Sequence, residues 1–263
     1  MENVGFIAGG LGFIFLMSAL GSATVLFFRR AMPDALHTVF LGFAAGVMVA
    51  ASVWSLLIPA IEAAEAAGAI GWIPAAGGFI LGAAFLFALD HLIPHLHAGN
   101  NALEGPRSSL RRSTLLVSAV TLHTLPEGMA VGLSIALAMQ SGGDPALFAA
   151  AGALALGIGI QNFPEGAAVT LPLRQEGLSA SRAFFVGLGS GAVEPAAGLV
   201  TVALAGLIAP VMPWLLAFAA GAMLYVVVEE LIPEAHLSSH SHAGTVSVLA
   251  GFVVMMVLDV ALG

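Results

Sequence analysis

The chain has 263 residues, of which 59% are hydrophobic and 8% charged, and this composition excludes an ordinary soluble domain and predicts a polytopic membrane protein. Because the chain contains no cysteine, disulfides, thiolate metal sites and cysteine nucleophiles are also excluded. The net charge of -8, from 15 acidic residues against 7 basic ones, disfavours nucleic acid as a partner and leaves cationic ligands open.

The predicted elements are all membrane-spanning helices, each of which needs about 20 mainly apolar residues. No basic residue precedes the first apolar run, so we expect a retained helix there rather than a cleaved signal peptide. Together the helices predict one transmembrane domain over residues 1–263, with a cytoplasmic loop at 94–113. The eight predicted helices cover residues 4–28, 36–58, 72–93, 114–139, 146–171, 182–207, 211–233 and 244–262.

The arginines predict how these helices are oriented in the membrane. Positive charge collects in cytoplasmic loops, and every arginine of the chain falls on one side of the predicted membrane. Both termini are therefore expected to face outward, and an error of one helix would scatter the arginines over both sides. The arginines are Arg29, Arg30, Arg107, Arg111, Arg112, Arg174 and Arg182.

Internal similarity divides the chain into two halves. LHTLPEGMAV begins at Leu122 in the fourth helix, and IQNFPEGAAV begins at Ile160 in the fifth. The partners in each matched pair differ by an odd number of helices, so they cross the membrane in opposite directions. This predicts an inverted repeat in a 3+2+3 arrangement, as in many transporters. The other matched segments are 43–48 with 218–223, 57–59 with 231–233, 20–22 with 188–190, and 89–90 with 258–259.

Ionisable and amide side chains gather near the middles of helices four, five and six. A charged side chain inside a bilayer costs on the order of 2.5 to 3.5 kcal/mol by insertion scales, so such residues are functional candidates. His123 and Glu127 are four residues apart, as are Gln161 and Glu165, so each pair points from one helical face. With Glu194 of helix six, these side chains are predicted to converge on one point.

The donor chemistry of these residues points to a metal ion. Pro126 and Pro164 interrupt backbone hydrogen bonding and are expected to leave carbonyl oxygens free nearby. Imidazole, carboxylate and amide oxygens without thiolate suit Zn²⁺ and other divalent first-row metals. The alternative is that the glutamates are protonated structural residues bonded to neighbouring helices, which explains a lone glutamate better than it explains a duplicated pattern.

Two further groups of polar residues lie nearer the membrane surfaces. Histidines and carboxylates within residues 90–97 and 229–242 form a cluster at the predicted cytoplasmic ends of helices three and seven. A metal exit or sensing site and an ordinary solvated helix end explain this cluster equally well. On the opposite side, Asp259, Glu62 and Glu65 are candidates to attract cations at an entrance, and interfacial solvation explains them as well.

The motifs His-x-x-Pro-Glu-Gly from His123 and Gln-Asn-x-Pro-Glu-Gly from Gln161, with Glu194, resemble those of the ZIP (Zrt/Irt-like) metal transporters, particularly their bacterial GufA-like branch. The resemblance covers nearly the whole chain. It implies uptake of Zn²⁺, and of Fe²⁺, Mn²⁺ or Cd²⁺, through a bacterial inner membrane, with the metal as substrate and no cofactor. It also implies a homodimer in which a four-helix transport unit of helices one, four, five and six slides against the rest.

The resemblance also assigns site residues. One metal position would use His123, Glu127, Gln161 and Glu165, and an adjacent one would use Glu127, Asn162, Glu165 and Glu194. A cytoplasmic exit site would use Asp90, His95, Glu230 and His240. Thr124 stands where the family usually has Asn, and Asn162 stands where some relatives have Asp. We therefore predict that the first position binds one metal ion firmly and the second binds weakly or not at all.

A membrane-embedded metallohydrolase is the alternative function. In such an enzyme a bound metal activates water and a glutamate acts as general base. The chain contains no H-E-x-x-H sequence, however, and a hydrolase has no need for symmetry-related copies of its ligand helix. The sequence therefore favours a metal transporter that is not an enzyme.

Overall fold

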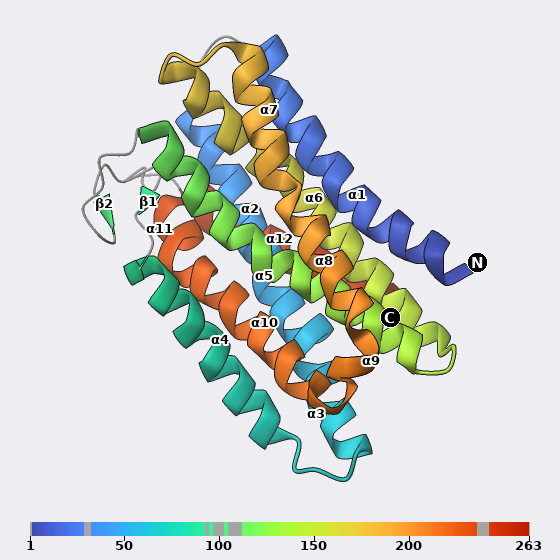
Figure 1. Cartoon of the computed structure of the whole chain (residues 1–263). Helices are drawn as coiled ribbons and strands as arrows, with labels where there is room; N and C mark the ends of the chain where they lie inside the picture. The colour runs from blue at the N-terminus through green and yellow to red at the C-terminus, as the bar shows by residue number, and fades with distance from the viewer. Residues whose placement is uncertain are drawn as a thin grey trace.

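The computed structural model is a bundle of long helices and describes residues 2–28, 33–92, 95–96, 103–104, 112–235 and 242–262 (Figure 1). Within these residues, 8 helices are long and apolar enough to cross a membrane, which confirms the predicted all-α polytopic fold. The elements are α1 (Glu2–Phe27), α2 (Asp34–Ala51), η1 (Ser52–Leu57), α3 (Ile58–Ala66), α4 (Trp72–Leu92), β1 (His95–Leu96), β2 (Leu103–Glu104), α5 (Arg112–Gln140), α6 (Pro145–Gln175), α7 (Ala180–Gly191), α8 (Val193–Ala203), α9 (Ala205–Ile208), η2 (Ala209–Val211), α10 (Met212–Val226), η3 (Val227–Leu231), α11 (Ile232–Ala235) and α12 (Ala243–Leu262).

Three local features differ from the predicted helices. The second helix continues through η1 and α3 to Ala66, because no helix breaker follows Pro59 at once. The sixth helix is interrupted at Ala192, where Pro195 cannot donate a hydrogen bond to the carbonyl of Gly191 and its ring crowds that carbonyl. The predicted loop at 94–113 contains the short antiparallel pair β1–β2, which is too brief for a periodicity to predict.

Two π-helical turns occupy corresponding places in the two halves of the chain. η1 and η3 each follow a Phe-Ala-Ala-Gly sequence and run into a Leu-Ile-Pro sequence. Pro59 and Pro233 each lack the N–H that would close the preceding helical turn, so the wider turn forms just before them. Ser55 lies in the first of these turns and Glu230 in the second. Such turns are frequent at functional sites.

The helices divide into two bundles. The first bundle consists of α1, α5, α6, α7 and α8, which contact one another. The second bundle consists of α2, α4, α10 and α12 together with the π-helical turns η1 and η3. The two bundles meet where α6 packs against α2 and α12, and where α5 packs against α10. Figure 1 shows α1 running along α6 in the first bundle and α4 along α10 in the second.

The described arginines lie at one end of the molecule. Arg112 begins α5, Arg174 lies in the last turn of α6, and Arg182 lies in the first turn of α7. Figure 1 shows the start of α5 and the α6–α7 connection at the same end of the bundle. We call this the arginine end. The opposite end carries the start of α1, the α5–α6 connection and the end of α12.

Glycines bring α2 and α12 into backbone contact. Gly46 of α2 faces the carbonyl of Val248, and Gly251 of α12 faces the carbonyl of Phe43. A Cβ atom at either glycine would collide with the opposite main chain. Small residues at interfaces are the usual means of packing helices in a membrane, where lipid removes most of the hydrophobic driving force between helices.

The same reciprocal contact joins α4 and α10. Gly221 of α10 faces the carbonyl of Phe79, and Gly82 of α4 faces the carbonyl of Phe218. Gly221 occupies the place in Phe-Ala-Ala-Gly that Gly46 occupies in α2. The packing of α4 on α10 therefore uses the same reciprocal glycine contacts as the packing of α12 on α2.

We expect Gly46→Ala to destabilise the protein, because the new methyl group would collide with the Val248 carbonyl and with Phe252 N, 2.6 Å from the ideal Cβ position. Overpacking of this kind costs about 1–3 kcal/mol. The matched control is Gly12→Ala in α1, where the Cβ would meet no atom of the described residues within 4 Å. Thermal unfolding in detergent should show a lower midpoint for the first variant only, and equal midpoints would contradict this account of the interface.

Candidate metal centre

Three carboxylates from three helices lie inside the first bundle. Glu127 of α5 is 1% exposed and Glu194 of α8 is 0% exposed, while Glu165 of α6 is partly buried. Glu127 lies within electrostatic range of both other carboxylates. Buried charges are stable only when they are paired or bind a metal ion, so this cluster requires a positive partner or protons.

Two amide side chains of α6 tie the cluster together. Gln161 Nε2 donates a hydrogen bond to Glu127 Oε1 at 3.3 Å, and Asn162 Nδ2 donates to Glu194 Oε2 at 2.6 Å. The same nitrogen of Asn162 lies 3.3 Å from the carbonyl oxygen of Ile14 on α1. Consecutive residues of α6 thus hold α5 on one side and α8 and α1 on the other.

The cluster contains more acceptors than donors. Buried oxygens normally have hydrogen-bond partners, so each exception requires an explanation. All the exceptions here are oxygens of carboxylates or amides, which are the atoms that coordinate a divalent cation. Five buried oxygens of the centre have no hydrogen-bond partner among the described residues: Glu127 Oε2, Gln161 Oε1, Asn162 Oδ1, Glu165 Oε1 and Glu194 Oε1.

The repeated Pro-Glu-Gly sequence explains why these helices come so close. Both α5 and α6 stay helical through their prolines, and the glycine after each glutamate forms a contact surface. Gly128 packs on the main chain of Glu194, and Gly166 packs on α1 between Ser18 and Ser22. Each motif therefore turns a carboxylate inward and admits a neighbouring helix beside it.

His123 lies where the two bundles meet. Its Nε2 is 2.5 Å from Glu230 Oε1 in η3, and it is within electrostatic range of Glu165. Asp90 of α4 completes a group, since one ligand atom from each of Asp90, His123 and Glu230 lies within 4.8 Å of the others. The structure thus brings a residue of the predicted central position together with two residues of the predicted exit site.

The other predicted exit residues are described less fully. His95 begins the short strand β1, and His240 lies outside the described residues. Thr124 is 6% exposed, and its hydroxyl donates to the carbonyl of Thr121 at 3.2 Å within its own helix. Thr124 and Asn162 are both uncharged, and the amide nitrogen of Asn162 already donates to Glu194.

At the opposite end, Asp259 is not a solvated interfacial residue. It is 8% exposed, whereas Glu62 and Glu65 are exposed. Ser55 Oγ donates to Asp259 Oδ1 at 2.6 Å. The sequence analysis did not single out Ser55. Ser55 lies nine residues after Gly46, as Glu230 lies nine residues after Gly221, and this shared spacing could have signalled it.

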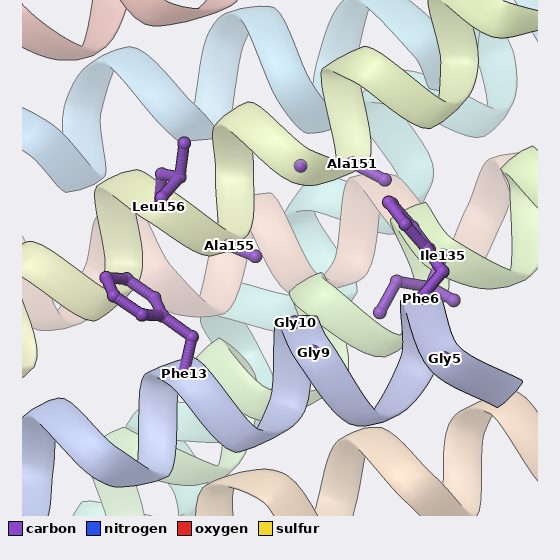
Figure 2. A pocket seen from close by; sticks show the side chains of 10 residues that line it. Gly5, Phe6, Gly9, Gly10, Phe13, Ile135, Ala151, Ala155 and Leu156 are labelled. Carbon is purple, nitrogen blue, oxygen red and sulfur yellow. The ribbon is translucent and has the colours of Figure 1, made fainter.

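An apolar hollow of about 650 Å³ lies between α1, α5 and α6, towards the opposite end. Figure 2 shows glycines and alanines along its walls, with phenylalanine and leucine side chains at its edges. None of its lining residues offers an oxygen or nitrogen side-chain donor, so it does not suit a cation. The lining residues are Gly5, Phe6, Gly9, Gly10, Phe13, Ile135, Ala151, Gly152, Ala155 and Leu156.

Comparison with known proteins finds relatives along nearly the whole chain. The family model described as ZIP Zinc transporter matches residues 104–259. The human protein named Zinc transporter ZIP11 is 39% identical over 97% of this chain and 96% of its own length. Zinc transporter GufA of Myxococcus xanthus is 42% identical over 80% of this chain and 81% of its own length. Zinc transporter ZIPB of Bordetella bronchiseptica is 39% identical over 99% of this chain and 82% of its own length.

Apolar membrane helices alone do not produce identity at this level across both halves of a chain. The residues matched by the family model include every polar residue of the centre. They also include His123 and Glu230 of the Asp90 group, and only Asp90 of that group lies before the match. The chain belongs to the ZIP family of zinc transporters.

Proposed function

We propose that this protein carries Zn²⁺ across a bacterial inner membrane into the cytoplasm through the centre formed by Glu127, Gln161, Glu165, Glu194 and His123. The observation that carries the proposal is the set of buried oxygens without hydrogen-bond partners among the described residues, next to an imidazole inside a membrane bundle. Members of the ZIP family are transporters and not enzymes, and zinc is their substrate rather than a cofactor. The metallohydrolase alternative is therefore not favoured.

In this proposal the first metal position is built around the two Pro-Glu-Gly glutamates. Glu127 Oε2 and Glu165 Oε1 are available acceptors, and Gln161 Oε1 is a third. A cation bound there replaces the hydrogen bond from Gln161 to Glu127 as the link between α5 and α6. Carboxylate and amide oxygens with the His123 imidazole form a donor set that Zn²⁺ accepts, and Fe²⁺, Mn²⁺ or Cd²⁺ are further candidate substrates.

The contact of His123 with the Asp90–Glu230 pair supports an exit route towards the arginine end. Glu165 lies within electrostatic range of His123, and His123 Nε2 lies 2.5 Å from Glu230 Oε1. A metal ion leaving the glutamates can therefore exchange ligands one at a time, through the imidazole, to the carboxylates of the second bundle. The arginines predict that this end faces the cytoplasm.

Alternating access is proposed to occur by movement of the first bundle against the second, in a homodimer. The centre lies within the first bundle, whereas Asp90 and Glu230 belong to the second, so relative movement changes the ligands that the metal meets. The main contacts between the bundles are those of α6 with α2, η1 and α12, and those of α5 with α10 and η1.

We expect Glu127→Ala and Glu165→Ala to abolish most Zn²⁺ flux into proteoliposomes. Loss of a residue that supports a metal site costs about 10–100-fold in affinity or activity, and loss of a direct ligand should cost at least as much. The control is Glu62→Gln, which removes an exposed carboxylate at the opposite end. Normal flux in the first two variants would contradict the proposed site, and metal-dependent hydrolysis without flux would contradict transport.

We expect the unsubstituted protein to bind one Zn²⁺ tightly, because Asn162 and Thr124 supply no negative charge to the adjacent position. Asn162→Asp should raise the stoichiometry towards two ions, since a carboxylate would replace the amide beside Glu194. Calorimetric titration at neutral pH measures both values. Two tight sites in the unsubstituted protein would show that the adjacent position is complete without the aspartate.

We expect Zn²⁺ affinity to fall as the pH is lowered from neutral to mildly acidic. The ligands bind metal only when deprotonated, so metal binding releases protons and protons compete with it. Fluorescence titration across this range would test the expectation, with Glu62→Gln as the control. An affinity that does not change with pH would argue against His123 and the glutamates as ligands.

A further inference from the structure

We propose that the thioether of Met255 and a notch at Gly157 form a latch that holds the first bundle in its present position against the second. This inference rests on the proposed function, in which the first bundle moves, and it names a contact that has to open before that movement. Met255 belongs to α12 of the second bundle, and Gly157 belongs to α6 of the first. Neither residue is part of the metal centre, so the latch acts on movement and not on metal coordination.

Glycine contacts inside each bundle meet the main chain of the neighbouring helix. In the first bundle, Gly128 faces the carbonyl of Glu194, and Gly21 faces the carbonyl of Phe163. In the second bundle, the glycines that join α2 to α12 and α4 to α10 make contacts of the same kind. A main-chain atom cannot withdraw unless its helix moves, so these contacts fix the helices of one bundle relative to one another.

The contact at Gly157 crosses from one bundle to the other and is of a different kind. A Cβ atom at this glycine would collide with Met255 Sδ, and Val47 Cγ1 of α2 follows at 3.6 Å from the same position. These neighbours are side-chain atoms. Among the glycines of the described residues, Gly157 is the one whose nearest neighbours lie in the other bundle. The bundles are therefore joined here by a side chain that can withdraw.

The side chain of Met255 is enclosed where it meets α6. Met255 is 0% exposed, and Gly157 is buried as well. α6 packs against both α2 and α12, so the thioether lies between α6 and the helices of the second bundle. An enclosed side chain makes many weak contacts, and sliding of the helices would break them together. The interlocked position is therefore a local energy minimum for the relative placement of the two bundles.

Methionine suits a latch that opens reversibly. Its side chain is unbranched and has three rotatable bonds, whereas a β-branched side chain would be stiff at its first torsion. Rotation of these bonds can free the notch while the main-chain contacts inside each bundle stay intact. Packed interfaces move between discrete arrangements and do not deform continuously. The latch thus gives the movement of the first bundle a defined stop.

The position that the latch holds is the one in which the centre lies beside its proposed exit route. His123 of the first bundle contacts Glu230 of the second, and Gly157 lies one helical turn before Gln161 on α6. Both contacts between the bundles therefore belong to one arrangement. Met255 has to leave the notch before the centre can move towards the opposite end.

Disulfide formation between the bundles measures how much of the protein is in the latched position. The chain has no cysteine of its own, so His123→Cys with Glu230→Cys supplies a reporter pair where the structure places two residues in contact. In this reporter, Gly157→Ala should lower the disulfide yield at short oxidation times by about fivefold or more, because the new methyl group displaces the thioether. The matched control on α6 is Gly152→Ala, whose Cβ would meet no atom of the described residues within 4 Å, and it should leave the yield unchanged.

Met255→Ala supplies a second arm, because it empties the notch without adding an atom to α6. This change should also lower the disulfide yield, and Gly157→Ala should have little further effect once Met255→Ala is present. Such non-additivity is expected of two residues in direct contact. A thermal unfolding midpoint close to that of the reporter would show that Gly157→Ala folds, and Met255→Ala decides the question if it does not.

An unchanged disulfide yield in the folded variants, or effects of the two changes that simply add, would overturn the latch. The disulfide assay does not depend on transport, so the latch and the proposed function are tested separately. Absence of Zn²⁺ flux in the unsubstituted protein would contradict the proposed function. An unchanged yield in a protein with normal flux would contradict only this inference.

Discussion

The burial of three glutamate side chains inside a membrane bundle is the constraint on which the rest of the structure depends. Glu127, Glu165 and Glu194 lie close enough to repel one another, and the amides of Gln161 and Asn162 satisfy only part of their hydrogen-bonding capacity. In a low-dielectric interior, the desolvation of three carboxylates without a positive partner raises the free energy of the folded state. In the proposed function, a divalent cation in transit supplies the missing positive charge.

Glycine packing allows the helices that carry the site to lie close to their neighbours. Gly128 and Gly166 allow α8 and α1 to approach the helices that carry the glutamates. The same device fixes the scaffold, where Gly46 and Gly251 join one pair of helices, and Gly82 and Gly221 join the other. Because these contacts involve main chain on one side, they set the register of each helix pair tightly.

Much of this organisation could be predicted from the sequence, because apolar length and the repeated Pro-Glu-Gly motif are local signals. Four-residue spacing correctly placed Gln161 where it meets Glu127. Spacing could not show that His123 reaches Asp90 and Glu230, because periodicity defines the face of a helix and not the helix that packs opposite. The π-helical turns and the partnership of Ser55 with Asp259 were missed for the same reason.

The proposed function depends most on the metal ion being held between Glu127, Gln161 and Glu165 during transport. Anomalous diffraction from crystals soaked in Zn²⁺ tests this most directly. The account predicts a zinc peak about 2.0–2.2 Å from oxygens of Glu127 and Glu165, with Gln161 turned to present its oxygen. Zinc bound only at exposed carboxylates, with the Gln161–Glu127 hydrogen bond intact, would contradict it.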